Sequence, residues 1–311
     1  MRAPILAAAL AIGLAAPAAA ETIYVTNQGS SDLSIIDGDS LIEAARVPVP
    51  GNPAGLAVAP ALGAVFVVSP ETRVLRRLAL NGGAITGEAV LDGLPMGVAV
   101  DAARGRILVT DWAGGRILVL DAATLAVTGS LATGAVPAGV ALSPDGRFVV
   151  SADRDADQLS VFDAETFAPL HRIPTGHHPW AVAFAPDGRV LSADVLADSL
   201  TVADPATGRI LGHVATGARP YGIAFAGTRG FVTNQYGDSV TVFDAATLRV
   251  EATVPVGEYP EGIDVSSDGR RVYVANWMSN TLGVIDAQSL EPLGEVATGD
   301  GPRAFGRFVA P

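Results

Sequence analysis

The sequence predicts an all-β fold, a seven-bladed β-propeller of four-stranded antiparallel blades, closed by a C-terminal strand that completes the N-terminal blade. Three observations predict it. A short apolar motif that ends in Asp recurs along the chain every 40 to 42 residues. Each interval contains four short apolar runs separated by turn residues. The first and last segments of the chain correspond to different strands of the repeat.

The repeated motif gives the number of units. From Asp121 onward its copies are 42, 41, 40 and 42 residues apart, and Asp37 lies 84 residues, twice 42, before Asp121. A degenerate copy, Val74–Ala79, fills that gap, so the sequence contains seven units. The regular copies are Ser34–Asp37, Leu118–Asp121, Ser160–Asp163, Thr201–Asp204, Thr241–Asp244 and Gly283–Asp286.

Four strands are expected in each unit, and the sixth unit shows them most clearly. β-branched and aromatic residues fill its apolar runs, and Gly, Asp, Asn and Pro bound them. Its predicted strands are Pro220–Ala226, Arg229–Asn234, Asp238–Phe243 and Arg249–Val256. Tight hairpins between the first and second runs are predicted at Pro144–Gly146, Pro186–Gly188 and Ser267–Gly269.

The two ends of the repeat region are complementary. The chain enters the repeat at a second strand, Ile23–Asn27, and leaves it on a segment that matches a first strand, Gly301–Val309. We therefore expect Pro302–Val309 to pair beside Ile23–Asn27. This pairing closes the ring and removes the free sheet edges that an open array would expose.

Residues 1–20 are predicted to be a secretory signal peptide. Arg2 is followed by the apolar run Ile5–Ala16, and the small residues Ala18–Ala20 form a cleavage site before Glu21. The remaining residues, 21–311, are expected to form a single propeller domain in the periplasm. No later segment reaches about 18 consecutive apolar residues, so no membrane span is expected in the mature chain.

The charge balance excludes several classes of partner. After Arg2 is removed, 19 basic residues, all Arg, oppose 32 acidic residues, a net charge of −13. An acidic chain repels phosphate backbones, so nucleic acid is not expected as a partner, whereas a basic protein is electrostatically easier. The sequence contains no Cys. Disulfides and covalently attached haem are therefore excluded.

Recurring tetrapeptides carry a family resemblance. Tyr24–Asn27, Phe231–Asn234 and Tyr273–Asn276 resemble the signature of YVTN-family β-propeller repeats, and a Gly-x-x-Pro-x-Gly pattern recurs with them, as at Gly257–Gly262. The resemblance covers nearly the whole predicted mature chain and implies the propeller fold. One subgroup of that family shares the length, the seven repeats and the signal peptide. It implies a role beside periplasmic oxidation systems that use pyrroloquinoline quinone (PQQ), in alcohol catabolism.

The two faces of the predicted disc differ. The face with the hairpins and the Asp-Ala-Ala-Thr turns, here called the turn face, is repetitive. The other face, here called the mouth face, carries the fourth-to-first connections and the second-to-third loops, and its residues vary between units. We expect the residue after each strand-opening Pro to ring the channel mouth there. These residues are Ala54, Met96, Ala138, Trp180, Tyr221, Glu261 and Arg303.

Large aromatic and charged side chains on the mouth face are the candidate site for a ligand or partner. Trp, Tyr and Arg are the usual anchors of interfaces. The alternative is that the aromatic residues only plug the channel, and that Glu261 and Arg303 form an exposed pair with each other. The candidate binding residues are Trp112, Arg154, His177, His178, Trp180, Tyr221, Glu261, Trp277 and Arg303.

Two possible metal sites are weaker interpretations, and neither a metal nor a cofactor is assigned. Asp153–Asp157 has the alternating carboxylates of a calcium loop but lacks its Gly and distal Glu. His177 and His178 are adjacent, so both ligate one metal only in a bent loop. The Asn or Asp that ends each second strand is expected to be structural. These residues are Asn27, Asp111, Asp153, Asp194, Asn234 and Asn276.

Function is expected to be binding or scaffolding in the periplasm, with a protein partner or a small ligand on the mouth face. No nucleophile elbow, metalloprotease helix, phosphate loop or Cys nucleophile is present. The alternative is a lactonase-like or other hydrolytic enzyme, with His177, His178, Glu261 and Asp111 at the channel mouth as acid and base. Seven-bladed lactonases support that alternative; no residue spacing selects it.

Overall fold

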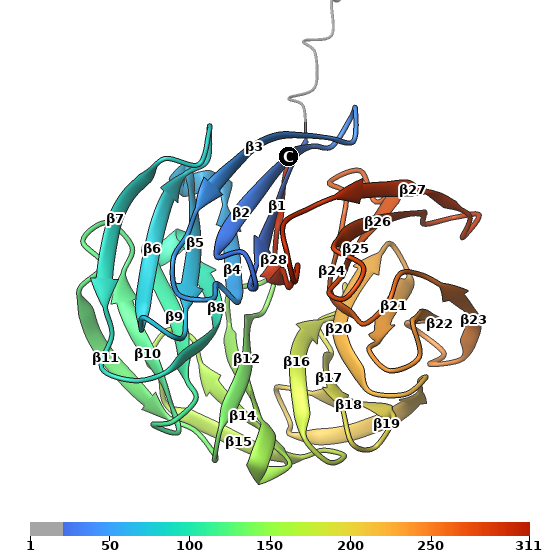
Figure 1. Ribbon diagram of the computed structural model, residues 1–311. Coiled ribbons are helices and arrows are strands. Elements are labelled where there is room, and N and C mark those ends of the chain that lie inside the picture. The colour runs from blue at the N-terminus through green and yellow to red at the C-terminus, as the bar shows by residue number, and fades with distance from the viewer. Residues whose placement is uncertain (1–20) are drawn as a thin grey trace, which may run out of the picture.

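A computed structural model describes residues 21–311 (Figure 1), so the predicted signal peptide, residues 1–20, lies outside the described residues. Seven antiparallel sheets surround a central axis, as predicted. Blade 1 contains β1 (Thr22–Asn27), β2 (Asp32–Asp37), β3 (Ile42–Pro48) and β29 (Val309–Ala310). Blade 2 contains β4 (Gly55–Ala59), β5 (Ala64–Ser69), β6 (Val74–Ala79) and β7 (Ile85–Val90), joined by β28 (Phe305–Arg307).

The other five blades are regular four-stranded sheets. They are β8 (Pro95–Asp101), β9 (Arg106–Asp111), β10 (Arg116–Asp121) and β11 (Val127–Ala132) in blade 3; β12 (Pro137–Leu142), β13 (Phe148–Asp153), β14 (Gln158–Asp163) and β15 (Pro169–Pro174) in blade 4; and β16 (Pro179–Phe184), β17 (Val190–Asp194), β18 (Ser199–Asp204) and β19 (Arg209–Ala215) in blade 5. Blade 6 has β20 (Pro220–Ala226), β21 (Arg229–Asn234), β22 (Ser239–Asp244) and β23 (Val250–Pro255), and blade 7 has β24 (Pro260–Val265), β25 (Arg271–Asn276), β26 (Thr281–Asp286) and β27 (Pro292–Ala297).

Burial follows the position of each strand in its blade. The second and third strands are buried along most of their length, as in β21 and β22, because neighbouring blades cover both faces. The fourth strands alternate between exposed and covered residues, as in β3, because they form the outer edge. Three short 3₁₀ turns, Pro60–Leu62, Ala102–Arg104 and Arg154–Ala156, interrupt the loops. Within the described residues, no helix is long and apolar enough to cross a membrane.

Ring closure is confirmed, but the closing strand is less regular than predicted. Thr22 pairs with Ala310 and Ile23 with Val309, and an isolated bridge joins Asn27 to Pro302. Between these points β28 turns away from β1 and pairs in parallel with β4 of blade 2 (Figure 1). Between these two pairings the closing segment has six residues (303–308) and β1 has three (24–26), so a continuous ladder is impossible and the surplus bulges inward.

The inner strands approach one another through the Pro-x-Gly pattern. A Cβ added at Gly222 would lie 2.6 Å from the carbonyl oxygen of Glu261 in the next blade, and one at Gly262 would lie 2.3 Å from that of Ala304. Both distances are too short for a side chain, so Gly at this position allows close packing around the axis.

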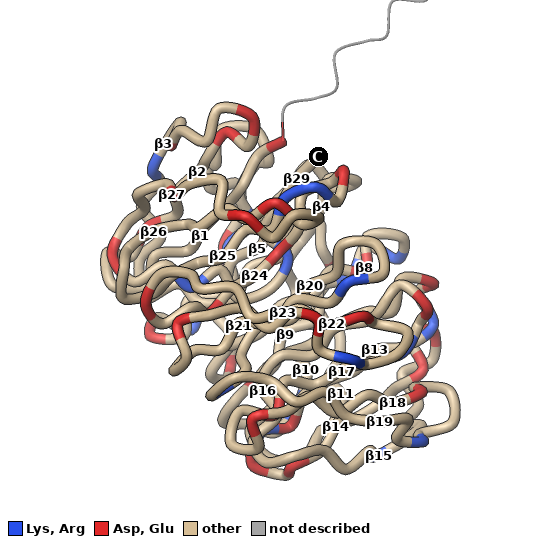
Figure 2. The backbone as a smooth tube through the Cα atoms, turned by 90° about the vertical axis from the view of Figure 1, so that its right-hand side faces the viewer, with Lys and Arg blue, Asp and Glu red and all other residues tan. Residues whose placement is uncertain are grey.

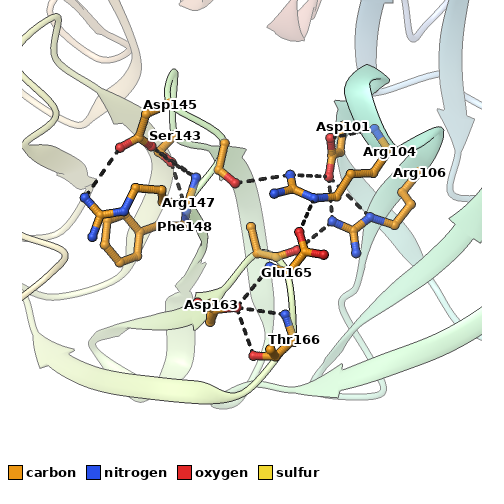
Figure 3. A network of polar contacts seen from close by, with 12 residues as sticks. Asp101, Arg104, Arg106, Ser143, Asp145, Arg147, Phe148, Asp163, Glu165 and Thr166 are labelled. Atoms are coloured by element: carbon orange, nitrogen blue, oxygen red, sulfur yellow. Dashed lines mark hydrogen bonds and ion pairs between the residues drawn. The ribbon is translucent and has the colours of Figure 1, made fainter.

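One kind of contact recurs between blades on the turn face. At every junction a side chain donates a hydrogen bond to a backbone carbonyl in or beside the turn between the third and fourth strands of the next blade. Arg106, for example, donates to the carbonyl of Ala164 at 2.5 Å. It also donates to buried Asp101 at 2.6 Å, and neighbouring Arg104 donates to Glu165 at 2.7 Å (Figure 3). The donors and acceptors are Tyr24 and Leu80, Arg77 and Ala123, Arg106 and Ala164, His171 and Ala206, Arg189 and Ala245, Arg229 and Ala287, and Arg271 and Gly38.

Candidate functional site

A repeated backbone device shapes the mouth face. In six of the seven copies the residue before the strand-opening Pro is left-handed, with Leu94 as the exception, and only one of the six is Gly: φ is 55° at His178, 59° at Arg219 and 58° at Tyr259. Non-Gly residues reach this conformation at an energetic cost, so surrounding contacts must hold it. An Asp of the preceding blade supplies one. The Oδ1 atoms of Asp157, Asp198 and Asp238 accept the amide N–H groups of His178, Arg219 and Tyr259 at 2.8, 2.8 and 2.9 Å.

These positions surround a recess of about 490 Å³ at the channel mouth, here called the mouth recess. It lies over blades 5, 6 and 7 and the closing segment, with Arg154 contributed by blade 4 and Gln28 by blade 1. The lining residues are Gln28, Arg154, His178, Trp180, Val195, Leu196, Arg219, Tyr221, Gln235, Tyr236, Tyr259, Glu261, Trp277, Met278 and Arg303.

Most of the sequence-predicted site residues meet in this recess. Arg154, His178, Trp180, Tyr221, Glu261, Trp277 and Arg303 line it, and the other two predicted residues do not. Trp112 lies beside the recess: its ring is 5.2 Å from that of Trp180 and lies under the Arg154 guanidinium at 5.2 Å. His177 faces solvent, with a side chain that is 76% exposed, and its Nδ1 lies 2.9 Å from an Asp157 carboxylate oxygen.

The recess floor is a buried polar network. Arg303 Nε lies 3.2 Å from Glu261 Oε2, and their side chains are only 14% and 5% exposed. Arg303 also donates to Gln28 Oε1 at 2.9 Å and to the Tyr221 hydroxyl, while Gln235 donates to Glu261 Oε1 at 2.7 Å. The expected pairing is present, but the pair is buried, not exposed. Burial raises the pKa of Glu261, and the Arg303 guanidinium opposes that rise.

Below the network, aromatic rings block the channel. The ring centroid of Trp180 lies 5.0 Å from that of Tyr221 and 6.0 Å from that of Phe305, and the Tyr221 and Phe305 centroids are 5.9 Å apart. Tyr221 is only 4% exposed, and burial raises the pKa of its hydroxyl above the usual value. Packing therefore accounts for Tyr221, which supports the floor and offers a ligand little surface. Trp180 is half-buried and contributes both to this plug and to the recess wall.

Sequence reasoning missed Arg219 and Tyr259, which face the recess from the position before the strand-opening Pro. In blades 4 to 7 this position is occupied by Val136, His178, Arg219 and Tyr259. The sequence alone therefore shows that large side chains occupy it in several blades. Leu196, Tyr236 and Met278, in the second-to-third loops, also line the recess and are 44%, 62% and 56% exposed. In the sequence, the signal for these three residues was a bulky side chain in each of three successive second-to-third loops.

The Asx residues at the ends of the second strands have a structural role, as expected, but several of them bond a segment distant in sequence and not only their own turn. Asn234 is fully buried, and its amide oxygen accepts the N–H of Gly217 at 3.0 Å in the connection that enters its blade. Asp194 accepts the N–H of Gly176 at 3.1 Å in the same way. Burial raises the pKa of Asp194, while the Thr201 and Ser192 hydroxyls oppose the rise. These side chains tie blades together, and they do not form a ring of ligands.

The residues of the weaker metal interpretations make protein contacts. Asp153 accepts hydrogen bonds from Gly134 N–H at 2.8 Å and from Ser151 at 2.7 Å, and Asp157 bonds both His177 and the His178 amide. Among residues 21–311, no group of three or more His, Cys, Asp or Glu side chains is arranged to hold a metal ion.

A second cavity, of about 700 Å³, opens on the turn face at the other end of the channel. Inner-strand residues such as Ala99, Val140 and Ala183 line it, together with Asp264. The Asp264 carboxylate accepts the N–H groups of Phe308 and Val309 at 2.8 and 3.0 Å, so it holds the closing segment in place. The repetitive turn sequences gave no indication of this cavity, because most of its wall comes from the inner strands, although turn residues such as Pro144 and Asp268 also line it.

Comparison with known proteins supports the fold and gives one functional lead. Residues 106–216, about a third of the chain, match the family described as "Lactonase, 7-bladed beta-propeller". Among curated proteins, none has a matching sequence. A functionally unknown protein from Desulfotomaculum acetoxidans has a similar structure, with a TM-score of 0.79 and 14% identity over 92% of this chain and 99% of that one.

Two further solved structures are similar. Hydrazine synthase from Kuenenia stuttgartiensis has a TM-score of 0.73 and 18% identity, covering 82% of this chain and 89% of that chain. The dihydro-heme d1 dehydrogenase NirN, solved in complex with DHE, has a TM-score of 0.68 and 18% identity, covering 93% of this chain and 74% of that chain. At these identities the likeness shows the fold alone, and the chain is a seven-bladed β-propeller whose lactonase-like sequence lies in blades 3 to 5.

Proposed function

We propose that this propeller is a periplasmic binding module and that the mouth recess is its binding site. One observation carries the proposal: large aromatic and charged departures from the repeat converge on one recess of about 490 Å³. That volume lies in the usual range of small-ligand pockets, and a buried network fixes the polar groups of its floor. Elsewhere the same positions hold Ala54 and Ala138, so the ring does not need bulky residues there.

The setting we propose is accessory to a periplasmic oxidation or transport system, such as PQQ-dependent alcohol catabolism. The signal-peptide pattern of residues 1–20 and the YVTN-like tetrapeptides support this setting. The acidic surface, with Asp and Glu spread over many loops (Figure 2), favours basic protein neighbours in such a system.

The test uses the protein purified from periplasmic extract with its bound molecules and partners. Small molecules released on denaturation are identified by mass spectrometry, and co-purifying proteins are identified in parallel. Tyr236→Ala combined with Met278→Ala should abolish recovery of the bound species, because both exposed side chains line the recess. Leu293→Ala, at another exposed position on the outer strand β27, is the control and should retain it. Equal recovery with both variants would refute the site.

A hydrolytic function is the second candidate, because of the lactonase match at residues 106–216. That segment supplies Arg154, His178 and Trp180 to the recess, whereas Glu261 and Arg303 lie outside it. A raised pKa suits Glu261 to proton transfer. Acid release from γ- and δ-lactones, followed at constant pH, tests this candidate. Turnover that Glu261→Gln and His178→Ala both abolish would favour it over binding alone.

A further inference from the structure

We infer that the mouth recess takes a flat organic anion, an aromatic ring system that carries a carboxylate. The inference rests on the proposed binding role of the recess and specifies its ligand. It combines three features: the charged side chains that line the recess, the way the aromatic faces are already used, and one arginine whose guanidinium has no hydrogen-bond or ion-pair partner within residues 21–311.

Most of the charged side chains that line the recess are cationic. The chain has a formal net charge of −12, yet the lining contains three Arg residues and one carboxylate, Glu261. Other carboxylates bond the lining residues without lining the recess themselves: Asp155 pairs with Arg154, and Asp198 and Asp238 accept backbone N–H groups. A ligand in the recess therefore meets guanidinium groups more often than carboxylates, which favours an anion.

A cationic ligand is disfavoured although the recess is rich in aromatic rings. Such rings attract cations, but here the protein's own guanidinium groups already lie over them. The Arg219 Cζ lies 5.4 Å from the Tyr236 ring centroid, and the Arg303 Cζ lies 5.7 Å from those of Trp180 and Tyr221. An incoming ammonium group would meet these positive charges first. The same arrangement favours an anion that bridges to a guanidinium while its rings stack on the wall.

Arg219 is the side chain best placed to receive the carboxylate. Arg303 is committed to Glu261, Gln28 and Tyr221, and Arg154 lies 3.1 Å from an Asp155 oxygen. Among residues 21–311, the Arg219 guanidinium forms no hydrogen bond or ion pair: it lies over the Tyr236 ring, and only the backbone N–H of Arg219 bonds a carboxylate. Its backbone is fixed by φ of 59° and by the Asp198 carboxylate on its N–H. A planar guanidinium can bind a carboxylate through two parallel hydrogen bonds.

The flat shape of the ligand follows from the wall beside Arg219. Tyr236, Tyr259 and Trp277 form a continuous aromatic run, with ring centroids 5.4 and 5.7 Å apart. Burial raises the pKa of Tyr259 to about 12, so its hydroxyl stays protonated and neutral. The buried indole N–H groups of Trp180 and Trp277 also lack acceptors among the described residues. The wall is thus aromatic and rich in donors, which complements a ring system that carries acceptors.

The test measures binding of four probes by calorimetry and by fluorescence quenching. All 3 Trp residues lie on the mouth face, so the protein reports occupancy without a label. The probes are naphthoate, its uncharged analogue naphthalenemethanol, its cationic analogue naphthylmethylammonium, and the saturated carboxylate cyclohexanecarboxylate. Naphthoate should bind most tightly, on the order of tenfold or more above each of the others, and added salt should weaken it.

Matched variants locate the site. Arg219→Gln should weaken naphthoate binding by about tenfold, and Arg219→Lys should lose part of it, because a single ammonium cannot make the paired contact. Arg209→Gln removes the same charge from an exposed position on the outer strand β19 and should have no effect. Tyr236→Ala should weaken naphthoate more than cyclohexanecarboxylate, because only the flat ring gains from stacking.

Each outcome decides the inference. Equal binding of naphthalenemethanol, tighter binding of the ammonium probe, or equal losses in Arg209→Gln and Arg219→Gln would overturn it. No naphthoate binding at up to about 10 mM would also overturn it. If that failure occurs while Tyr236→Ala with Met278→Ala still abolishes recovery of a bound species from extract, the ligand class is wrong and the binding role stands. If recovery is unaffected as well, both proposals fail.

Discussion

The two faces of the disc share a scaffold but differ in how they use it. On the turn face, all seven junctions are joined by a side-chain donor that reaches a carbonyl of the next blade, as Arg106 reaches Ala164 and Arg229 reaches Ala287. On the mouth face, the backbone is equally repetitive, but its side chains range from Val136 to Tyr259 at one position. The difference teaches that repetition accounts for the stability of this ring and that departures from repetition indicate its function.

Loss of closure should have the largest effect, because both faces depend on it. Removal of residues 302–311 deletes β28 and β29 and leaves β1 without its inner neighbour. We expect the cooperative unfolding transition to disappear, since the truncated array exposes an unpaired edge and loses its longest-range contacts. Calorimetry measures this. Removal of exposed Pro311 alone should leave the transition intact, and a stable truncated protein would show that the ring holds without its closing segment.

A turn-face contact should affect stability and leave binding alone. Arg106→Ala deprives buried Asp101 of a 2.6 Å partner and leaves the Ala164 carbonyl without its donor. We expect a loss of roughly 2–4 kcal/mol in the free energy of unfolding, measured in urea. Arg147→Ala is the control on the same face (Figure 3), because its side chain is 67% exposed and its loss should change stability by about 0.5 kcal/mol or less. Similar losses in both variants would contradict the role of the repeated contact.

The converse should hold on the mouth face. Arg219→Gly relieves a left-handed residue, φ of 59°, and deletes the charge that we assign to ligand binding. The free energy of unfolding should stay constant or rise by up to about 1 kcal/mol, while recovery of the bound species falls. Thermal unfolding and the extract experiment measure the two quantities. A clear loss of stability would mean that the Arg219 side chain itself packs the junction.

Acid should produce the smallest and most distributed effect, which we expect chiefly on the turn face. The Thr247 hydroxyl and N–H donate to Asp244 and hold its pKa below the usual value, and the equivalent turns at Asp121 and Asp163 do the same. A carboxyl whose pKa is lowered on folding stabilises the fold above its unfolded pKa, and this stability is lost as pH falls through the folded pKa. Thermal midpoints should therefore decline below about pH 4, and less steeply in Asp244→Asn than in the unaltered protein.

The sequence was sufficient for most of the fold. The spacing of the Asp motifs predicted seven blades, and the offset between Ile23–Asn27 and Gly301–Val309 predicted closure, both confirmed by the strand pairing. The excursion of β28 toward β4 was not predictable, because it results from surplus residues that have no repeat equivalent. The contacts between blades were not predictable either. Nothing in the sequence distinguishes an Arg that faces solvent from one that donates to a carbonyl of the next blade, as Arg229 does.

For the site, the sequence indicated which face of the disc carries it, but not how deeply its residues are buried. Trp180, Glu261 and Arg303 were identifiable as departures from small residues, and they meet in one recess. Burial of the Glu261–Arg303 pair was not identifiable, because it depends on Gln28 and Gln235 from two other loops. Arg219 and Tyr259 precede a Pro, and only the left-handed backbone turns such residues toward the axis. That conformation is set by Asp198 and Asp238 of the preceding blades, about 21 residues away.

Closure by two distant ends has a kinetic consequence. Each blade forms from neighbouring hairpins, whereas the pairing of Thr22 with Ala310 joins residues 288 positions apart (310 − 22). Loop-closure entropy makes such a contact late in folding, so single blades can form before the ring exists. Contacts made after the folding transition state act mainly by slowing unfolding. We therefore expect the short β29 to affect the lifetime of the folded propeller more than the rate at which it folds.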